Sequence, residues 1–314
     1  MNITKYLIIC LLIVSLAFVG CNASRQESGV SSPYYGGTEG IIGEFEEIGS
    51  LVSQSGFPEV WEDQGIPVSV RLSNKGEYTI PAGQIHFAVK GIKIPEDFQG
   101  IEAVKTNPNE IEKVSEYLPE GGDDLIDFGE AFYIKGVKGT FYDANIFVEY
   151  TYPYEQTIVV PKVCFKGDPY DETICKVDEG KQAFISGGPV QIGSVVQRPA
   201  GKGRISIEIP VRNVGGGKAK VPGAGFTSDD GFSTMYDEYL MEVPDGWECS
   251  AKGTGDVVRV TKTGTTVIRC KYGFYGTPIP ENDVYTSTFD LKLSYIYWDF
   301  VSQTVRIREN PELN

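Results

Sequence analysis

The chain has 314 residues, about twice the ~150 residues of an average domain, so its length predicts two globular domains. Its 43 acidic and 28 basic residues give a formal charge of −15, which argues against nucleic-acid binding, because such partners need Lys and Arg to displace counterions from phosphate. The single histidine, His86, excludes any site built from two imidazoles and makes Ser-His or Cys-His catalysis depend on one residue.

The first residues have the order of an export signal. Residues 1–5 carry one Lys, residues 6–19 form an apolar run broken only by Ser15, and Gly20 follows. Charged, apolar and small residues in this order are typical of a signal peptide, and the run is shorter than the ~20 residues of a comfortable membrane span. We therefore expect a signal peptide over residues 1–20.

The end of this signal, Ala-Phe-Val-Gly-Cys over residues 17–21, resembles a lipobox, the motif at which a lipoprotein precursor is cleaved and its new N-terminal cysteine is acylated. The resemblance implies acylation of Cys21 and a lipid anchor in a membrane, with the protein on the extracellular or periplasmic side. Phe18 replaces the Leu that the motif prefers, so a retained N-terminal anchor and ordinary cleavage remain alternatives. The Ser- and Gly-rich start of residues 21–55 predicts a flexible tether.

Cysteine usage agrees with export. Beyond residue 21 the chain has four cysteines, Cys164, Cys175, Cys249 and Cys270. An even number in an exported chain predicts disulfides, and one close pair in each expected domain favours Cys164–Cys175 and Cys249–Cys270. The alternative, a zinc site with four cysteine ligands, requires closely spaced pairs that neither spacing provides.

A strand pattern occurs twice along the chain. Residues 66–76 alternate apolar and polar side chains and run into Asn-Lys-Gly, and residues 205–215 repeat the pattern 139 residues later and run into Asn-Val-Gly. A second match aligns residues 144–152 with residues 289–297, each containing Tyr-x-Tyr. Period-two alternation predicts half-buried strands, and the shared order predicts two copies of one β unit.

Each copy is expected to close with one more strand. These strands cover residues 156–161 and residues 303–308, and both begin with Gln-Thr. We expect each to be separate from the Tyr-x-Tyr strand before it.

The alternating strand with its Asn-x-Gly corner, the Pro/Gly turn and the late Tyr-x-Tyr strand resemble the Ig-like modules of extracellular bacterial and archaeal proteins, of the CARDB and related kinds. The resemblance covers about residues 60–165 and 189–308 of this chain. Together with the lipobox it implies a prokaryotic surface lipoprotein. It implies an all-β fold with two tandem Ig-like β-sandwich domains, at residues 56–186 and 187–314. Such modules act as stalks, spacers or adhesive units, and the resemblance implies no catalytic residue and no cofactor.

One segment of the first domain has a helical pattern. Residues 107–118 offer an N-cap Asn, Pro at the first helical position and apolar residues at helical spacing. We expect a short helix there, within an insertion over about residues 95–130. It would either carry a binding surface or cap the open end of the sandwich.

Two acidic loops are weak candidates for calcium, which needs six to eight oxygen ligands. Their carboxylates are Asp123, Asp124, Asp127, Asp229 and Asp230. Neither loop has EF-hand spacing, so we interpret both as solvated turns and expect no metal. His86 is expected on the outward face of a strand over residues 84–90.

Aromatic residues are abundant, with 18 Tyr, 16 Phe and 3 Trp. Most of them suit a pleated, half-buried strand surface. Exposed rings also stack on sugars or on protein partners, and the candidate binding patch consists of Tyr272, Phe274, Tyr275 and Trp298.

Taken together, the sequence predicts a non-enzymatic cell-surface lipoprotein that presents its Ig-like domains for adhesion, binding or structural display. Its expected partners are a membrane, through the N-terminal lipid, and a surface protein or glycan. Two alternatives remain: a subunit of a surface filament assembled by strand addition, and a carbohydrate-active enzyme or its accessory module.

Overall fold

The structure is a computed structural model that describes residues 30–48, 51–52, 56–171, 173–226, 235–261, 264–274 and 276–311. The predicted signal peptide and Cys21 lie outside these residues. Every regular element in the described part is a β-strand, and residues 32–314 form one compact unit. No helix in the described ranges is long and apolar enough to cross a membrane.

The described strands form three sheets. In the order of its paired strands, the first sheet consists of β1 (Ile41–Phe45), β4 (Ile66–Asn74), β8 (Asp123–Tyr133) and β6 (Phe98–Ile101). In the same order, the second consists of β10 (Glu179–Lys181), β13 (Val195–Pro199), β14 (Ile205–Asn213), β19 (Thr266–Tyr272) and β17 (Trp247–Ser250), with β12 (Val190–Ile192) also on β14.

The third sheet is shared between the two halves of the chain. Its main path consists of β18 (Val257–Thr261), β16 (Tyr236–Glu242), β20 (Val284–Arg308), β9 (Phe141–Lys166), β5 (His86–Lys90) and β7 (Val104–Thr106). Four short strands join it at the sides: β2 (Leu51–Val52), β3 (Pro58–Trp61), β11 (Phe184–Ile185) and β15 (Lys218–Lys220).

The predicted repeat is present in β4 and β14. Both strands alternate buried and more exposed residues, with the apolar positions inward as expected. Their corners also match. The side-chain carbonyl of Asn74 accepts the Gly76 amide at 3.1 Å, and that of Asn213 accepts the Gly215 amide at 3.0 Å. The Asn-x-Gly pattern therefore forms the same Asx turn twice.

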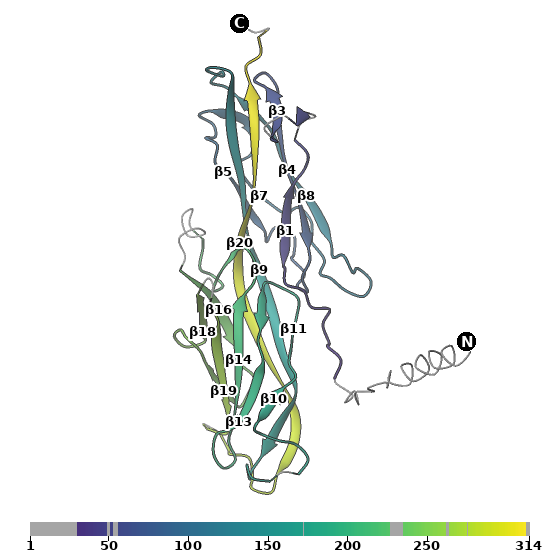
Figure 1. The fold of residues 1–314 in the computed structure, drawn as a ribbon, viewed down its shortest axis with the longest axis vertical. Helices are drawn as coiled ribbons and strands as arrows, with labels where there is room; N and C mark the ends of the chain where they lie inside the picture. The colour runs from purple at the N-terminus through teal and green to yellow at the C-terminus, as the bar shows by residue number, and fades with distance from the viewer. Residues whose placement is uncertain are drawn as a thin grey trace, which may run out of the picture. The chain divides into compact units, whose positions relative to one another are not determined.

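The expected closing strands do not exist as separate elements. β9 and β20 run through them without a break, and the two strands pair antiparallel from Phe141 opposite Arg308 to Lys166 opposite Val284 (Figure 1). One bulge near Ser287 is the sole irregularity in this register. Because the last part of β20 lies between the first part of β9 and β3, residues from the end of the chain complete the sheet of its first half.

The shared sheet packs against the other two in a sandwich-like arrangement. Phe87 of β5 contacts Phe128 of β8 edge to face, with ring centroids 6.1 Å apart. In the second half, Phe165 of β9 contacts Tyr272 of β19 at 5.1 Å, and Trp247 of β17 contacts Phe289 of β20 at 4.7 Å. The all-β fold is therefore as predicted, whereas the domain boundary at residues 186/187 remains a prediction.

The expected helix over residues 107–118 is wrong. The segment is extended, because its backbone pairs with a distant loop: Ile111 and Ile80 exchange amide hydrogen bonds of 2.9 and 3.1 Å, and the Val114 amide donates to Gly76. The buried Asn107 does not cap a helix. Its carbonyl accepts the Ile85 amide at 2.8 Å. Tertiary hydrogen bonds thus replace the local helical ones.

Part of the expected tether is also a strand. β1 pairs with β4, and two of its outer amides are already bonded: Ile41 donates to the Tyr152 hydroxyl and Gly43 to the Tyr150 hydroxyl, both at 3.1 Å. A Cβ at position 43 would lie 3.1 Å from the Tyr150 ring, so a larger residue there would push that ring aside by a few tenths of an ångström. Order thus begins well before residue 55, through hydrogen bonds that a Ser/Gly-rich composition does not reveal.

Candidate binding site

The shared sheet has one face that is not covered by either of the other sheets. We call this the outer face, and define it by the outward residues of β9 over residues 141–151 and of β20 over residues 298–308. They are Phe141, Asp143, Asn145, Phe147, Glu149 and Thr151 on β9, and Trp298, Phe300, Ser302, Thr304, Arg306 and Arg308 on β20. In the register these residues form pairs, from Phe141–Arg308 at one end to Thr151–Trp298 at the other.

Four aromatic rings gather at the Trp298 end of the outer face. Phe147 contacts Phe300 at 6.1 Å, Phe300 contacts Trp298 at 5.5 Å, and Phe226, in a neighbouring loop, stacks on Trp298 at 6.5 Å. The Trp298 indole is almost fully buried beneath this cluster, whereas the three Phe rings are half-buried. The rings therefore form a packed apolar cluster, in which the three Phe rings are partly accessible to solvent.

A groove of about 220 Å³ lies beside these rings, lined by β5, β7, β9 and β20 as well as by Phe226. His86 and Lys90 enter it from β5, and Glu149 enters from β9. Burial raises the pKa of Glu149, while the Lys90 ammonium and a hydrogen bond with Trp298 oppose the rise. The groove thus combines hydrogen-bond donors and acceptors with aromatic rings, which is the usual composition of a small-molecule site.

The opposite end of the outer face consists of paired charges with exposed rings. Arg306 holds Asp143 in a bidentate pair at 2.7 and 2.8 Å, and lowers the pKa of that carboxyl. Arg308 holds Glu59 of β3 in the same way, at 2.6 and 2.9 Å. The Arg306 guanidinium lies 3.9 Å from the ring centroid of Phe141. Each carboxylate at this end is neutralised by its own guanidinium.

The structure divides the predicted patch. Trp298 lines the groove, whereas Tyr272 packs against Phe165 at the far end of β9. The Phe165 ring also stacks on the Tyr285 ring, with centroids 4.9 Å apart. Tyr285 and Trp298 are 13 residues apart on β20, roughly 40 Å along a strand. Phe274 lies under Arg204 and Lys271, and Tyr275 lies outside the described residues.

The residues missed by sequence reasoning are Glu149 and Phe226, which line the groove, and Phe147 and Phe300, which lie beside it in the ring cluster. Phe147 and Glu149 occupy outward positions of a strand that was predicted, so alternation marks them as surface residues. What the sequence does not show is that β9 and β20 pair side by side, which brings Phe300 opposite Glu149. His86 is exposed on β5, with Phe87 and Val89 buried, as predicted.

The three described carboxylates that were candidate calcium ligands accept hydrogen bonds from other side chains. Asp123 accepts from Arg71 at 2.9 Å, Asp124 from the Asn109 amide group at 3.2 Å, and Asp127 from Ser69 at 3.1 Å. Asp229 and Asp230 lie outside the described residues. Within the ranges that the structure does describe, no three His, Cys, Asp or Glu side chains are grouped so as to hold a metal ion.

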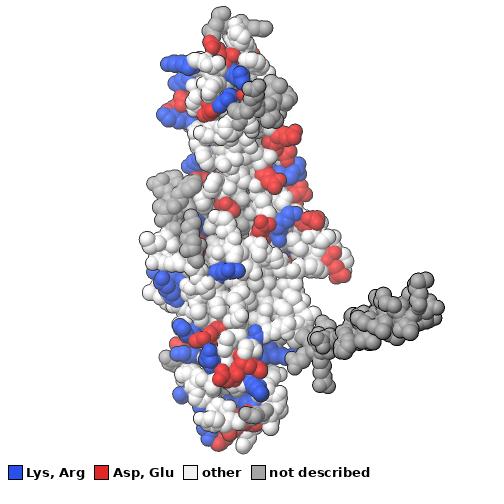
Figure 2. All heavy atoms as spheres, in the orientation of Figure 1, with Lys and Arg blue, Asp and Glu red and all other residues white. Residues whose placement is uncertain are grey.

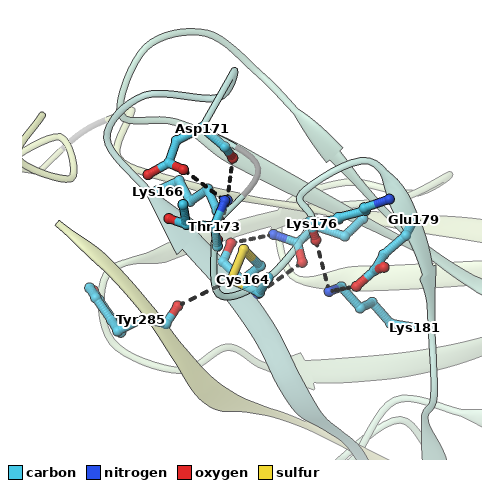
Figure 3. Close-up of a disulfide and its surroundings, with 10 residues drawn as sticks. Cys164, Lys166, Asp171, Thr173, Lys176, Glu179, Lys181 and Tyr285 are labelled. Atoms are coloured by element: carbon cyan, nitrogen blue, oxygen red, sulfur yellow. Dashed lines mark hydrogen bonds and ion pairs between the residues drawn. A yellow bond between two sulfur atoms is a disulfide. The ribbon is translucent and has the colours of Figure 1, made fainter. Parts of the chain in front are cut away.

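Both predicted disulfides are present, Cys164–Cys175 and Cys249–Cys270. Figure 3 shows the first, which closes a loop around the buried Lys166. The Lys166 ammonium donates to the carbonyls of Asp171 and, at 2.7 Å, Thr173. The second bridge joins directly opposed residues of β17 and β19. The first bridge therefore ties the end of β9 to the loop that follows it, and the second ties two neighbouring strands of the second sheet.

A second cavity, of about 290 Å³, lies between β1 and the segment around Gly215. Tyr150, Tyr152 and Tyr297 line it, and burial raises the pKa of all three. Their hydroxyls accept backbone amides, for example that of Gly217 onto Tyr297 at 3.0 Å. These tyrosines therefore serve the packing of the chain, and we do not treat the cavity as the binding site.

No protein-family model and no curated protein sequence matches the chain. Among solved structures, that of the CupB6 tip adhesin from Pseudomonas aeruginosa is 11% identical, with a TM-score of 0.18, and the alignment covers 87% of this chain and 99% of that chain. A TM-score this low carries no argument about fold or function, so the function is inferred from the chain itself.

Proposed function

We propose that this chain is a non-enzymatic surface protein, exported and anchored through a lipid on Cys21, that presents a stiff β-sandwich unit for adhesion or binding. The observation that carries the proposal is the continuous pairing of β9 with β20. At about 3.3 Å per residue, the 26 residues of β9 correspond to roughly 80 Å of strand. Such a ribbon gives the binding surface a stiff, continuous support.

Two further observations support display rather than assembly or catalysis. Two outer amides of β1, those of Ile41 and Gly43, are occupied by tyrosine hydroxyls, and the Arg259 amide of the edge strand β18 donates to the Lys252 carbonyl at 2.6 Å. These edges offer few free donors to an added strand.

On the outer face, Asp143 and Glu149 are six residues apart, about 20 Å, which is too far for a glycosidase pair.

The anchor is tested by the intact mass of the full chain extracted from membranes. We expect loss of residues 1–20, addition of acyl groups, and a mass lower by the hydrogens that two disulfides remove. Cys21→Ser is the matched variant and should leave the acyl mass absent and the protein unanchored. A wild-type chain with an unmodified Cys21 and no membrane association contradicts the anchor.

Surface presentation is tested by adding protease or a non-permeant label to intact cells. Labelling of lysines such as Lys90, which is exposed, is expected without cell lysis. Labelling that requires lysis contradicts surface display.

A further inference from the structure

The charge of the outer face differs from that of the whole chain. The chain carries 43 acids against 28 bases, whereas Glu59 and Asp143 on and beside this face are each bound to an arginine, and Lys90 lies near Glu149. Figure 2 shows acids and bases interspersed over the side in view, with a largely uncharged band between them. A face of this kind attracts neither polyanions nor polycations.

The groove has the groups that bind hydroxyls. Glu149 is an acceptor, Lys90 is a donor, the Thr151 hydroxyl is both, and His86 supplies a ring nitrogen of either kind. Glu149 is directly opposite Phe300 in the register, so a ligand resting on the ring lies within reach of the carboxylate. Aromatic rings next to mixed donors and acceptors suit a ligand with apolar C–H faces and a rim of hydroxyls.

A cationic or anionic ligand fits less well. Aromatic rings near a carboxylate can bind cations, but Lys220 already lies 4.9 Å from the Phe226 ring and Lys90 is close to Glu149. An anion would meet the carboxylate of Glu149 within the same groove. The local charges therefore favour a neutral ligand.

From these observations we propose that the groove holding Glu149, His86 and Lys90, together with the Phe300 and Phe147 rings beside it on the outer face, binds a neutral glycan, with the sugar ring stacked on Phe300 and its hydroxyls bonded to Glu149 and Lys90. The proposal rests on the proposed binding function and names its ligand class. The volume of about 220 Å³ accommodates about one sugar residue, and the rest of the outer face continues beyond it.

The test is isothermal titration of the full-length chain in detergent with linear neutral pentasaccharides of glucose, mannose and N-acetylglucosamine, and with a pentasaccharide of galacturonic acid. We expect at least one neutral probe to bind with Kd below about 1 mM. Phe300→Ala and Glu149→Gln should each weaken it about tenfold, because each removes one side of the contact. Tyr170→Ala, which removes an exposed ring on a distant loop, should leave Kd unchanged.

Thermal melts of each variant identify any loss of fold, and Lys90→Gln provides a second variant at an exposed position. Its expected effect is a weakening of neutral binding with no change in melting temperature. The proposal is overturned if no neutral probe binds at about 1 mM, if the groove variants bind as well as the wild type, or if the acidic probe binds more tightly. None of these results affects the mass and surface-labelling tests, so a failed glycan site is distinguishable from a failed surface function.

Discussion

The side chain of Gln156 holds together three separate parts of the chain, and its replacement provides a quantitative test of the fold. The residue is fully buried on β9. Its amide nitrogen donates to Ser186 and Val190 carbonyls at 2.7 and 3.0 Å, and its carbonyl accepts the Val190 amide at 2.9 Å and the Tyr295 hydroxyl at 2.7 Å. All four hydrogen bonds are lost in Gln156→Leu.

The expected loss follows from these four bonds. At about 1 kcal/mol of net stability for each, and with buried partners left unsatisfied, Gln156→Leu should lower the free energy of unfolding by about 4–6 kcal/mol. This corresponds to a fall in Tm of roughly 10 °C or more for a unit of this size. Gln99→Leu on the exposed side of β6 is the control, and should change stability by no more than about 0.5 kcal/mol.

The assay is urea unfolding followed by circular dichroism and tryptophan fluorescence at neutral pH. A loss below about 1 kcal/mol for Gln156→Leu would refute the reasoning, because it would mean that the segment around Val190 does not depend on this amide. A similar loss in Gln99→Leu would refute it too, since the effect would then belong to leucine on any strand.

Three other predictions concern the second disulfide, a buried acid and the tyrosines. The double variant Cys249→Ser and Cys270→Ser removes a bridge between residues 21 apart, and should lower the free energy of unfolding by about 3 kcal/mol and lower the urea midpoint. An unchanged midpoint contradicts this prediction. Burial raises the pKa of Asp299 above its unfolded value of 3.8, so the ionised carboxylate destabilises the fold at neutral pH. Asp299→Asn, which keeps an acceptor for the Phe300 amide, should therefore raise Tm at pH 7, and this gain should vanish near pH 3; a gain equal at both pH values excludes the ionisation as its cause. Burial also raises the pKa of core tyrosines such as Tyr239 above 10, so stability should fall as pH rises beyond 10, and tyrosinate absorbance should appear together with unfolding rather than before it.

The local alternation of apolar and polar residues was enough to predict the strands that are buried on one side. β4 and β14 followed from alternation, and the turns at Asn74 and Asn213 followed from Asn-x-Gly. These features depend on a few neighbouring residues. The disulfide pairing also followed, since each pair is close in sequence.

Features that depend on distant parts of the chain were either not predicted or predicted wrongly. The segment after Asn107 has every local signal of a helix, yet its amides bond to the loop around Ile80. The continuity of β9 depends on a partner strand that begins more than a hundred residues later. For the same reason the groove was only partly predicted: Trp298 was identified, but its neighbours Phe147 and Phe300 come together only when the two long strands pair.

The place of the last part of β20 has a consequence for the order of folding if the chain is exported as proposed. Val305 and Ile307 are fully buried between β9 and β3, so the first half lacks part of its core until residue 308 has been synthesised and translocated. Until then β9 and β3 have unpaired edges, the condition in which strands most readily pair with other chains. We therefore expect the nascent protein to need protection on the far side of the membrane for as long as translocation lasts, and to become resistant to protease in both halves at once, when the end of β20 arrives.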